Sequence, residues 1–218
     1  MKVRRLNLNA IENSLRAVQA DFAIINQSLS VPRDWLSDAV LRRLMAGYRE
    51  VDTLLDAGID LYAPGNSGLV LKLNVLVLCG VEHQLSDECA QLVAATHERF
   101  YAKSDGDIEA LVDWVRASRH EPVWRRAAGA YIHILSQPQL FIEGNHRTGA
   151  LLMSWMLARD GKPPFVLSVE NAKAYFDPST LAKHARKRTL KMMLARPKLV
   201  KRFASLLKQE AEKEHVLD

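Results

Sequence analysis

Cysteine is scarce in this chain of 218 residues, which contains only Cys79 and Cys89, ten positions apart. A secreted domain held together by disulfides has more cysteines in a shorter chain. Neither cysteine has a histidine or another cysteine at the spacing of a metal site. The sequence therefore predicts two buried, reduced thiols in a cytosolic protein.

Long hydrophobic runs are also missing. The longest apolar stretch is 75–79, far below the ~20 residues that span a bilayer. Positive charges near the first residue are not followed by the apolar segment of a signal peptide. We therefore expect no membrane partner, and we expect a bacterial cytoplasmic location.

Acidic residues are absent from one basic segment near the C-terminus. The formal net charge is +5, and the surplus is concentrated between residues 183 and 202, which contain no Asp or Glu. The cations of this segment are Lys183, Arg186, Lys187, Arg188, Lys191, Arg196, Lys198, Lys201 and Arg202. Such a run usually forms a solvated helix face. Binding of nucleic acid or an acidic partner is the alternative, and nucleic-acid binding would weaken with salt.

Composition and periodicity indicate an all-α globular protein. Hydrophobic residues make up 48% of the chain and charged residues 25%, as in ordinary globular proteins. Apolar residues recur at three- and four-residue spacing in most segments. We predict helices at 10–28 (capped by Asn9), 33–57 (Pro32 in its first turn, Gly58 at its end), 86–100 (capped by Ser86), 109–118, 123–135 and 148–158, one turn at 170–175, and a helix from Asp177–Thr180 that Pro197 divides within 181–213. Segment 68–79 fits a strand or a helix, and we favour a helix.

Two domains are expected from this order of elements. Residues 1–60 would form an N-terminal helical extension packed on the core, and residues 61–218 the main domain with its basic C-terminal helices. Residues 165–169 form a short extended piece between predicted helices.

The most informative stretch is 139–150, a short loop between two predicted helices. Gly144 and Asn145 tolerate left-handed backbone geometry and end the preceding helix. The amides that follow open a long apolar helix, whose N-terminus attracts anions. Arg147 adds a forked donor suited to phosphate, and the Glu143 carboxylate suits Mg²⁺. The alternative is an ordinary helix stop with a surface ion pair.

The order of these residues resembles the signature of the Fic/Fido family, His-x-Phe-x-Asp/Glu-Gly-Asn-Gly-Arg-x-x-Arg. Phe141, Glu143, Gly144, Asn145 and Arg147 match it, and the resemblance covers roughly residues 95–180. It implies a Fic-like helical bundle, a nucleotide-binding loop, Mg²⁺ and ATP as cofactors, and transfer of AMP from ATP to a hydroxyl of a target protein. It also implies a small β-hairpin flap near residues 99–108, which would dock the target.

Three positions depart from that signature. Gln139 replaces the histidine that acts as general base, His146 replaces a glycine, and Ala150 replaces the last arginine. A glutamine amide takes no proton near neutral pH. We therefore do not expect ordinary AMP transfer. His146 is the candidate replacement for the base, and His133, six residues before Gln139, is a weaker one.

Three functions remain open at this point. The first is a Fic-like protein that keeps a nucleotide loop with Phe141, Gly144, Asn145, His146 and Arg147 but lacks AMP transfer. The second is an active transferase with an altered donor that uses His146. The third is a helical nucleic-acid-binding protein that uses its basic C-terminal segment.

Overall fold

The computed structural model describes residues 5–81, 87–104, 106–209 and 213–217. In order, the elements are α1 (Leu8–Ala20), α2 (Phe22–Ser28), α3 (Asp38–Asp56), α4 (Ser67–Cys79), α5 (Asp87–Tyr101), α6 (Ile108–Ala117), α7 (Val123–Leu135), α8 (Asn145–Arg159), α9 (Ala172–His184), α10 (Leu190–Gln209) and the short 3₁₀ helix η2 (Lys213–His215). Within these residues the only β pairing is two isolated bridges. The predicted all-α fold is confirmed.

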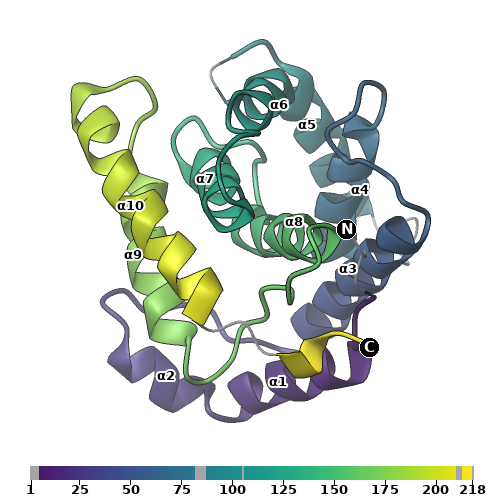
Figure 1. Cartoon of the computed structure of the whole chain (residues 1–218). Coiled ribbons are helices and arrows are strands. Elements are labelled where there is room, and N and C mark those ends of the chain that lie inside the picture. Colours follow the sequence, from purple (N-terminus) through teal and green to yellow (C-terminus); the bar gives the residue numbers. More distant parts are fainter. Residues whose placement is uncertain (1–4, 82–86, 105, 210–212, 218) are drawn as a thin grey trace.

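Helix α8 lies at the centre of the bundle (Figure 1) and packs against α7, α3 and α4. Twelve of its fifteen residues are buried, because neighbours cover it on all sides. Gly149 allows α7 to come close: a Cβ there would lie 2.6 Å from Cδ2 of Tyr131. The apolar run that follows the loop thus becomes the central helix of the molecule.

One large hydrophobic cluster joins most of the helices. It contains buried side chains from α1, α3, α4, α7, α8 and α10, while a smaller cluster lies around α2. Helix α3 belongs to the large cluster together with α7 and α8. The boundary at residue 60 stays a prediction.

Helix boundaries near the N-terminus differ from the predicted ones. The predicted helix at 10–28 is divided at Asp21 into α1 and α2. Its N-cap is Asn7, whose side chain accepts from Ala10 N at 3.3 Å, and not Asn9. Helix α3 begins at Asp38 after Ser37, so Pro32 precedes it. A side-chain cap outweighed the periodic pattern at both starts.

The two C-terminal prolines do not divide helices as predicted. Helix α9 begins at Ala172, ahead of the predicted start near Asp177, and runs through Pro178. Helix α10 runs through Pro197. A proline inside a helix removes one hydrogen bond, but buried side chains lie on both sides of each proline. Packing on the core therefore holds both halves in line.

The segment with two interpretations is helical. Helix α4 has seven buried residues and little segregation of polar and apolar faces. A helix that is apolar on all sides is a buried one. Such a helix has no polar face, so periodicity alone did not distinguish a helix from a strand in this segment. Residues 163–168 have no regular structure, in keeping with the extended piece predicted there.

The predicted β-hairpin flap is absent from the described part of residues 99–108. Helix α5 continues to Tyr101, and α6 starts at Ile108. Asp107 caps α6 by accepting from Ala110 N at 2.7 Å and also accepts from Ser104 N at 2.8 Å. Ser104 and Asp107 therefore belong to the capped start of α6, and Asp105 lies outside the described residues.

The prediction of reduced thiols is wrong. Cys79, at the end of α4, and Cys89, near the start of α5, form a disulfide with a Cα–Cα distance of 6.0 Å. The count of cysteines did not reveal that the end of α4 and the start of α5 lie close together. The predicted cap Ser86 lies outside the described residues.

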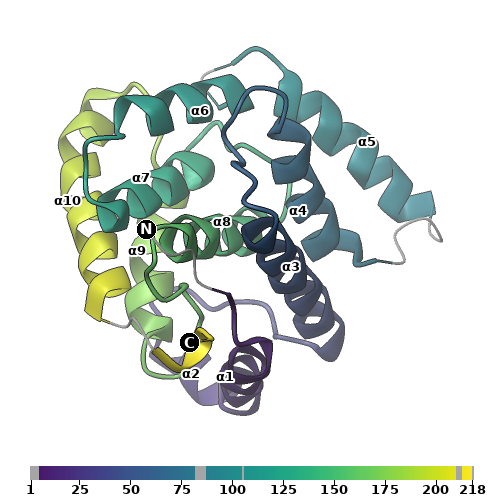
Figure 2. The same cartoon turned by 45° about the vertical axis from the view of Figure 1, so that its right-hand side comes forward.

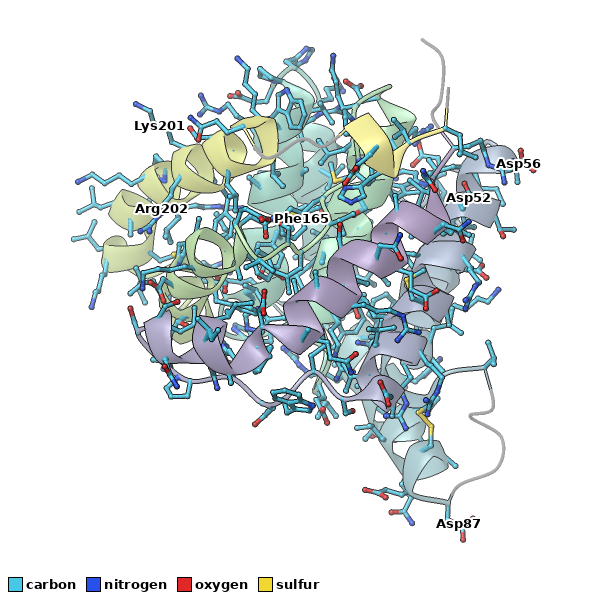
Figure 3. The ribbon with its side chains drawn as sticks, turned by 90° about the horizontal axis from the view of Figure 1, so that it is seen from below. Asp52, Asp56, Asp87, Phe165, Lys201 and Arg202 are labelled. Carbon is cyan, nitrogen blue, oxygen red and sulfur yellow. A yellow bond between two sulfur atoms is a disulfide. The ribbon has the colours of Figure 1, made fainter. Side chains whose placement is uncertain are left out.

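The two ends of the described chain lie together against α3. Leu6 and Val216 form an antiparallel bridge, and the Asp52 carboxylate accepts from Nε and Nη2 of Arg5 at 2.8 and 2.6 Å. Asp52 and Asp56 lie beside this terminal segment in Figure 3, and η2 lies against α1 in Figure 2.

Among the described residues, no helix is both long and apolar enough to cross a membrane.

Candidate functional site

The loop between α7 and α8 turns sharply at Gly144. This residue is the N-cap of α8 and has a left-handed backbone, with φ of 76°. A Cβ at Gly144 would lie 2.8 Å from Nδ2 of Asn74. Both the backbone angle and the close neighbour require glycine here. The predicted left-handed turn is therefore present, but it opens α8 and does not end α7, which already ends at Leu135.

Asn145 fixes the shape of the loop from inside. Its Oδ1 accepts from Phe141 N at 3.0 Å, and its Nδ2 donates to Phe141 O at 2.8 Å. The Phe141 ring is buried and stacks on Phe100 with a centroid separation of 5.5 Å. Both side chains thus face the core, so only their backbone groups are available to a ligand.

Asn74 of α4 is a positioning residue that sequence reasoning missed. It is fully buried, and its Nδ2 donates to the Glu143 carbonyl at 2.9 Å and to Thr148 Oγ1 at 3.0 Å. It joins the last turn of the loop to the first turn of α8. An asparagine inside the mostly apolar segment 69–78 was the available signal, since a buried amide needs hydrogen-bond partners.

The first turn of α8 presents its backbone amides at the loop. Thr148 N donates to Gly144 O at 2.9 Å, so Asn145, His146 and Arg147 form the turn whose N–H groups have no partner within the helix. The positive end of the helix dipole lies at the same point. This is the geometry of an anion site at a helix N-terminus.

Arg147 and Glu143 lie together at this opening. Nη2 of Arg147 is 3.6 Å from Oε1 of Glu143, and Nη1 donates to the Val77 carbonyl at 2.5 Å. Burial lowers the pKa of Arg147, Glu143 raises it and Arg43 lowers it. Arg147 therefore also stabilises the C-terminal end of α4, and its Nη2 side remains directed to Glu143.

Gln139 makes no contact suited to proton transfer. The side-chain Nε2 of Gln139 donates to the Leu135 carbonyl at 3.0 Å, and the backbone carbonyl of Gln139 accepts from Nη2 of Arg99 at 2.5 Å. The amide caps the last turn of α7 and holds no proton that it exchanges near neutral pH. The position at which the Fic signature has a base is thus a structural hydrogen-bond donor.

His146 lies with its ring against α7. Nδ1 is 3.0 Å from the Tyr131 hydroxyl, while Nε2 is buried without a hydrogen-bond partner. Burial, with nearby Arg33, Lys183 and Arg147, lowers the pKa of His146 to about 3. A base this weak accepts a proton poorly at neutral pH. His146, the candidate replacement for the base, is therefore unsuited to that role in this position.

His133 is buried in α7. Burial, with Lys187 and Arg196, lowers the pKa of His133 to about 3. Its Nε2 has no hydrogen-bond partner. The ring is a packing residue in this arrangement.

Further cations surround the opening of α8. The charge of Arg43 lowers the pKa of Arg147, and the charges of Arg33 and Lys183 lower the pKa of His146. Arg43 also lines a surface pocket of about 370 Å³ with Arg42 and Arg49. A second pocket of about 410 Å³ lies over the turn between α5 and α6. The sequence did not connect these cations with the loop, because the arginines lie far before it in the chain and Lys183 lies on α9.

Glu143 is the one predicted metal ligand, and its side chain is 62% exposed. The described residues contain no group of three or more His, Cys, Asp or Glu side chains that would hold a metal ion. A single carboxylate fits Mg²⁺ only where phosphates and water supply the other ligands. The donor set therefore suits a metal that arrives with a nucleotide.

An all-α bundle with a Glu-Gly-Asn turn before its central buried helix fits the class of Fic-like folds. The chain is 35% identical over 69 residues to the protein adenylyltransferase fic-1 of Caenorhabditis briggsae and to that of Caenorhabditis elegans. Each match covers 30% of this chain and 13% of the relative. The chain thus spans a small part of the curated relatives, and the matches indicate a Fic-like relationship.

No protein-family model matches the chain. No solved structure matches it either.

Proposed function

We propose that this chain is a Fic-like protein that binds the phosphates of a nucleotide, with ATP as the expected one, and lacks ordinary AMP transfer. The observation that carries the proposal is the opening of α8. There the first bond of the helix runs from Thr148 N to Gly144 O, so the amides of Asn145, His146 and Arg147 have no partner within α8. This geometry favours a phosphate group.

The local charge supports the same ligand. Arg147 lies at the opening and Arg43 lies near it, so Arg43 supplies a second guanidinium group in place of the arginine that Ala150 replaces. Arginine forms bidentate hydrogen bonds with phosphate oxygens. Glu143 would contribute one ligand to the Mg²⁺ of the nucleotide, and the remaining ligands would come from phosphate and water.

Loss of AMP transfer follows from the groups at the loop. Attack by a target hydroxyl requires a base within hydrogen-bond reach. Gln139 has no basic atom, and burial keeps the pKa of His146 at about 3. The protein is therefore proposed to act through nucleotide binding, as a nucleotide-responsive or regulatory partner of another protein.

Isothermal titration calorimetry with ATP and Mg²⁺ tests the proposal. We expect binding by the unchanged protein and a loss of about tenfold or more in Arg147→Ala, because a charge-assisted contact contributes about 1.5–3 kcal/mol. Glu143→Ala should weaken binding only when Mg²⁺ is present.

Arg159→Ala is the matched control, because it removes an arginine at the opposite end of α8 that pairs with Asp60 at 2.8 Å. Its affinity for ATP should equal that of the unchanged protein. No detectable heat with the unchanged protein, or equal affinities in Arg147→Ala and Arg159→Ala, would reject the phosphate site.

A further inference from the structure

Four large apolar side chains are exposed where α9 ends and α10 begins. Leu190, Met193 and Leu194 are 72%, 65% and 69% exposed, and Leu181 is 60% exposed. The first three are spaced i, i+3 and i+4, so they share one face of α10. Leu181 lies on α9, and only residues 185–189 separate the two helices. Clustered exposed apolar side chains mark an interaction site.

The same surface is cationic. Between Asp177 and Glu210 the sequence contains ten Lys and Arg residues and no acid. Lys183, Arg186, Lys191 and Lys198 are exposed around the apolar side chains. Lys201 and Arg202 project outward further along α10 (Figure 3). A partner that covers the apolar side chains therefore meets positive charge at their rim.

This surface is attached to the loop that leads to α8. Gln137 N donates to the Ala185 carbonyl at 2.8 Å, and Lys187 N donates to the Gln137 carbonyl at 2.7 Å. Nζ of Lys187 also donates to the Pro138 carbonyl at 2.6 Å. The connection 185–189 thus pairs with the chain two residues before Gln139. A molecule bound here would contact the connection that holds the start of this loop in place.

We propose that the junction of α9 and α10 binds an acidic protein segment with an apolar face, such as an amphipathic helix that carries Leu on one side and Glu or Asp around it. The apolar side chains would bury against the Leu stripe, and the cations would pair with the flanking carboxylates. Only the connection between this surface and the loop rests on the proposed function; the docking surface itself does not.

Other occupants fit the observations less well. Nucleic acid would satisfy the cations, but its phosphates would leave Leu190 and Leu194 uncovered. A second copy of this chain carries net charge +5 and the same acid-free segment, so charge opposes self-association through this face. A protein segment with both apolar and acidic side chains satisfies both properties at once.

Fluorescence anisotropy tests the proposal. The probe is a labelled 18-residue peptide in which Leu occupies one helical face and Glu most other positions. A scrambled peptide of the same composition, a poly-Glu peptide, duplex DNA and phosphatidylserine vesicles are the comparison arms. We expect the amphipathic peptide to bind best. The Met193→Glu/Leu194→Glu variant should lose at least tenfold in affinity for it. Both positions are exposed, so the fold should tolerate the change, and circular dichroism would verify this.

Ile24→Glu is the matched control, since Ile24 is 69% exposed on α2, which lies near the other end of α9 (Figure 1). It should bind the peptide like the unchanged protein. The proposal is overturned if the amphipathic peptide does not bind, if the scrambled or poly-Glu peptide binds as well, or if DNA or vesicles bind more tightly. ATP calorimetry on Met193→Glu/Leu194→Glu separates the proposals, because loss of docking should leave nucleotide affinity unchanged.

Discussion

Lowering the pH from 7 to 5 should reduce the free energy of unfolding by about 4 kcal/mol, about 2 kcal/mol for each of two buried histidines. Burial lowers the pKa of His133 and of His146 to about 3. Both rings are therefore neutral in the folded protein, whereas the unfolded chain binds protons below about pH 6.5. Their contribution is fully present above the unfolded pKa and is lost as the pH falls. Urea unfolding at the two pH values measures the difference.

Single substitutions separate the two contributions. His133→Leu should remove about half of the pH dependence between pH 7 and 5, and His146→Leu the other half. His120→Leu is the control, because the His120 side chain is exposed in the folded protein; it should leave the slope unchanged. Burial also lowers the pKa of His215 and adds a smaller effect of the same sign. Equal stability of the unchanged protein at both pH values would contradict the burial of these rings.

Asn145→Ala should destabilise the fold by about 2–4 kcal/mol. The substitution leaves both the N–H and the carbonyl of Phe141 without their hydrogen bonds from Asn145, and a buried polar group left unpaired costs about 1–3 kcal/mol. Both bonds are short, at 3.0 and 2.8 Å, and Asn145 is buried. Chemical denaturation monitored by far-ultraviolet circular dichroism gives the value.

Two further variants sharpen that measurement. Asn145→Asp keeps the acceptor for Phe141 N but sets a carboxylate oxygen against Phe141 O in a buried position, so its loss should be at least as large as that of Asn145→Ala. Asn13→Ala, an exposed position on α1, should change stability by less than about 0.5 kcal/mol. A loss below about 1 kcal/mol for Asn145→Ala would show that the side chain does not hold the loop.

Much of the helical framework was predictable because periodicity and punctuation agree. Gly58 follows the end of α3 as expected, and Gly144 forms the turn that opens α8, each with a positive φ. The failures have physical causes. Pro178 and Pro197 lie within helices because tertiary packing outweighs the lost backbone bond. The disulfide was missed because no local pattern shows that two helix ends meet.

The candidate site was predicted in part. The order Glu143, Gly144, Asn145 and Arg147 indicated the turn and the first turn of the helix. It did not indicate that Asn145 faces the core. Asn74 and Arg43 come from distant segments, and their roles depend on the packing of α3 and α4 against α8, which short-range patterns do not encode.

The β-hairpin flap expected from the family resemblance is absent from the described part of its segment. The Asp-Gly pair at 105–106 suggested a hairpin, but Asp107 caps α6 instead, so the described part of that segment offers no strand edge. The sequence alone does not separate the exposed apolar side chains of α10 from its buried ones. Burial distinguishes Phe203 and Leu207, which pack in the core, from Leu190 and Leu194, which do not.

A crystal structure of the protein grown with ATP and Mg²⁺ is the most direct test of the central claim. We predict that a phosphate group of the nucleotide accepts hydrogen bonds from the amides of Asn145, His146 and Arg147, with Gln139 still bonded to the Leu135 carbonyl. Nucleotide bound elsewhere, or a first turn of α8 whose amides are closed off by protein atoms, would contradict it.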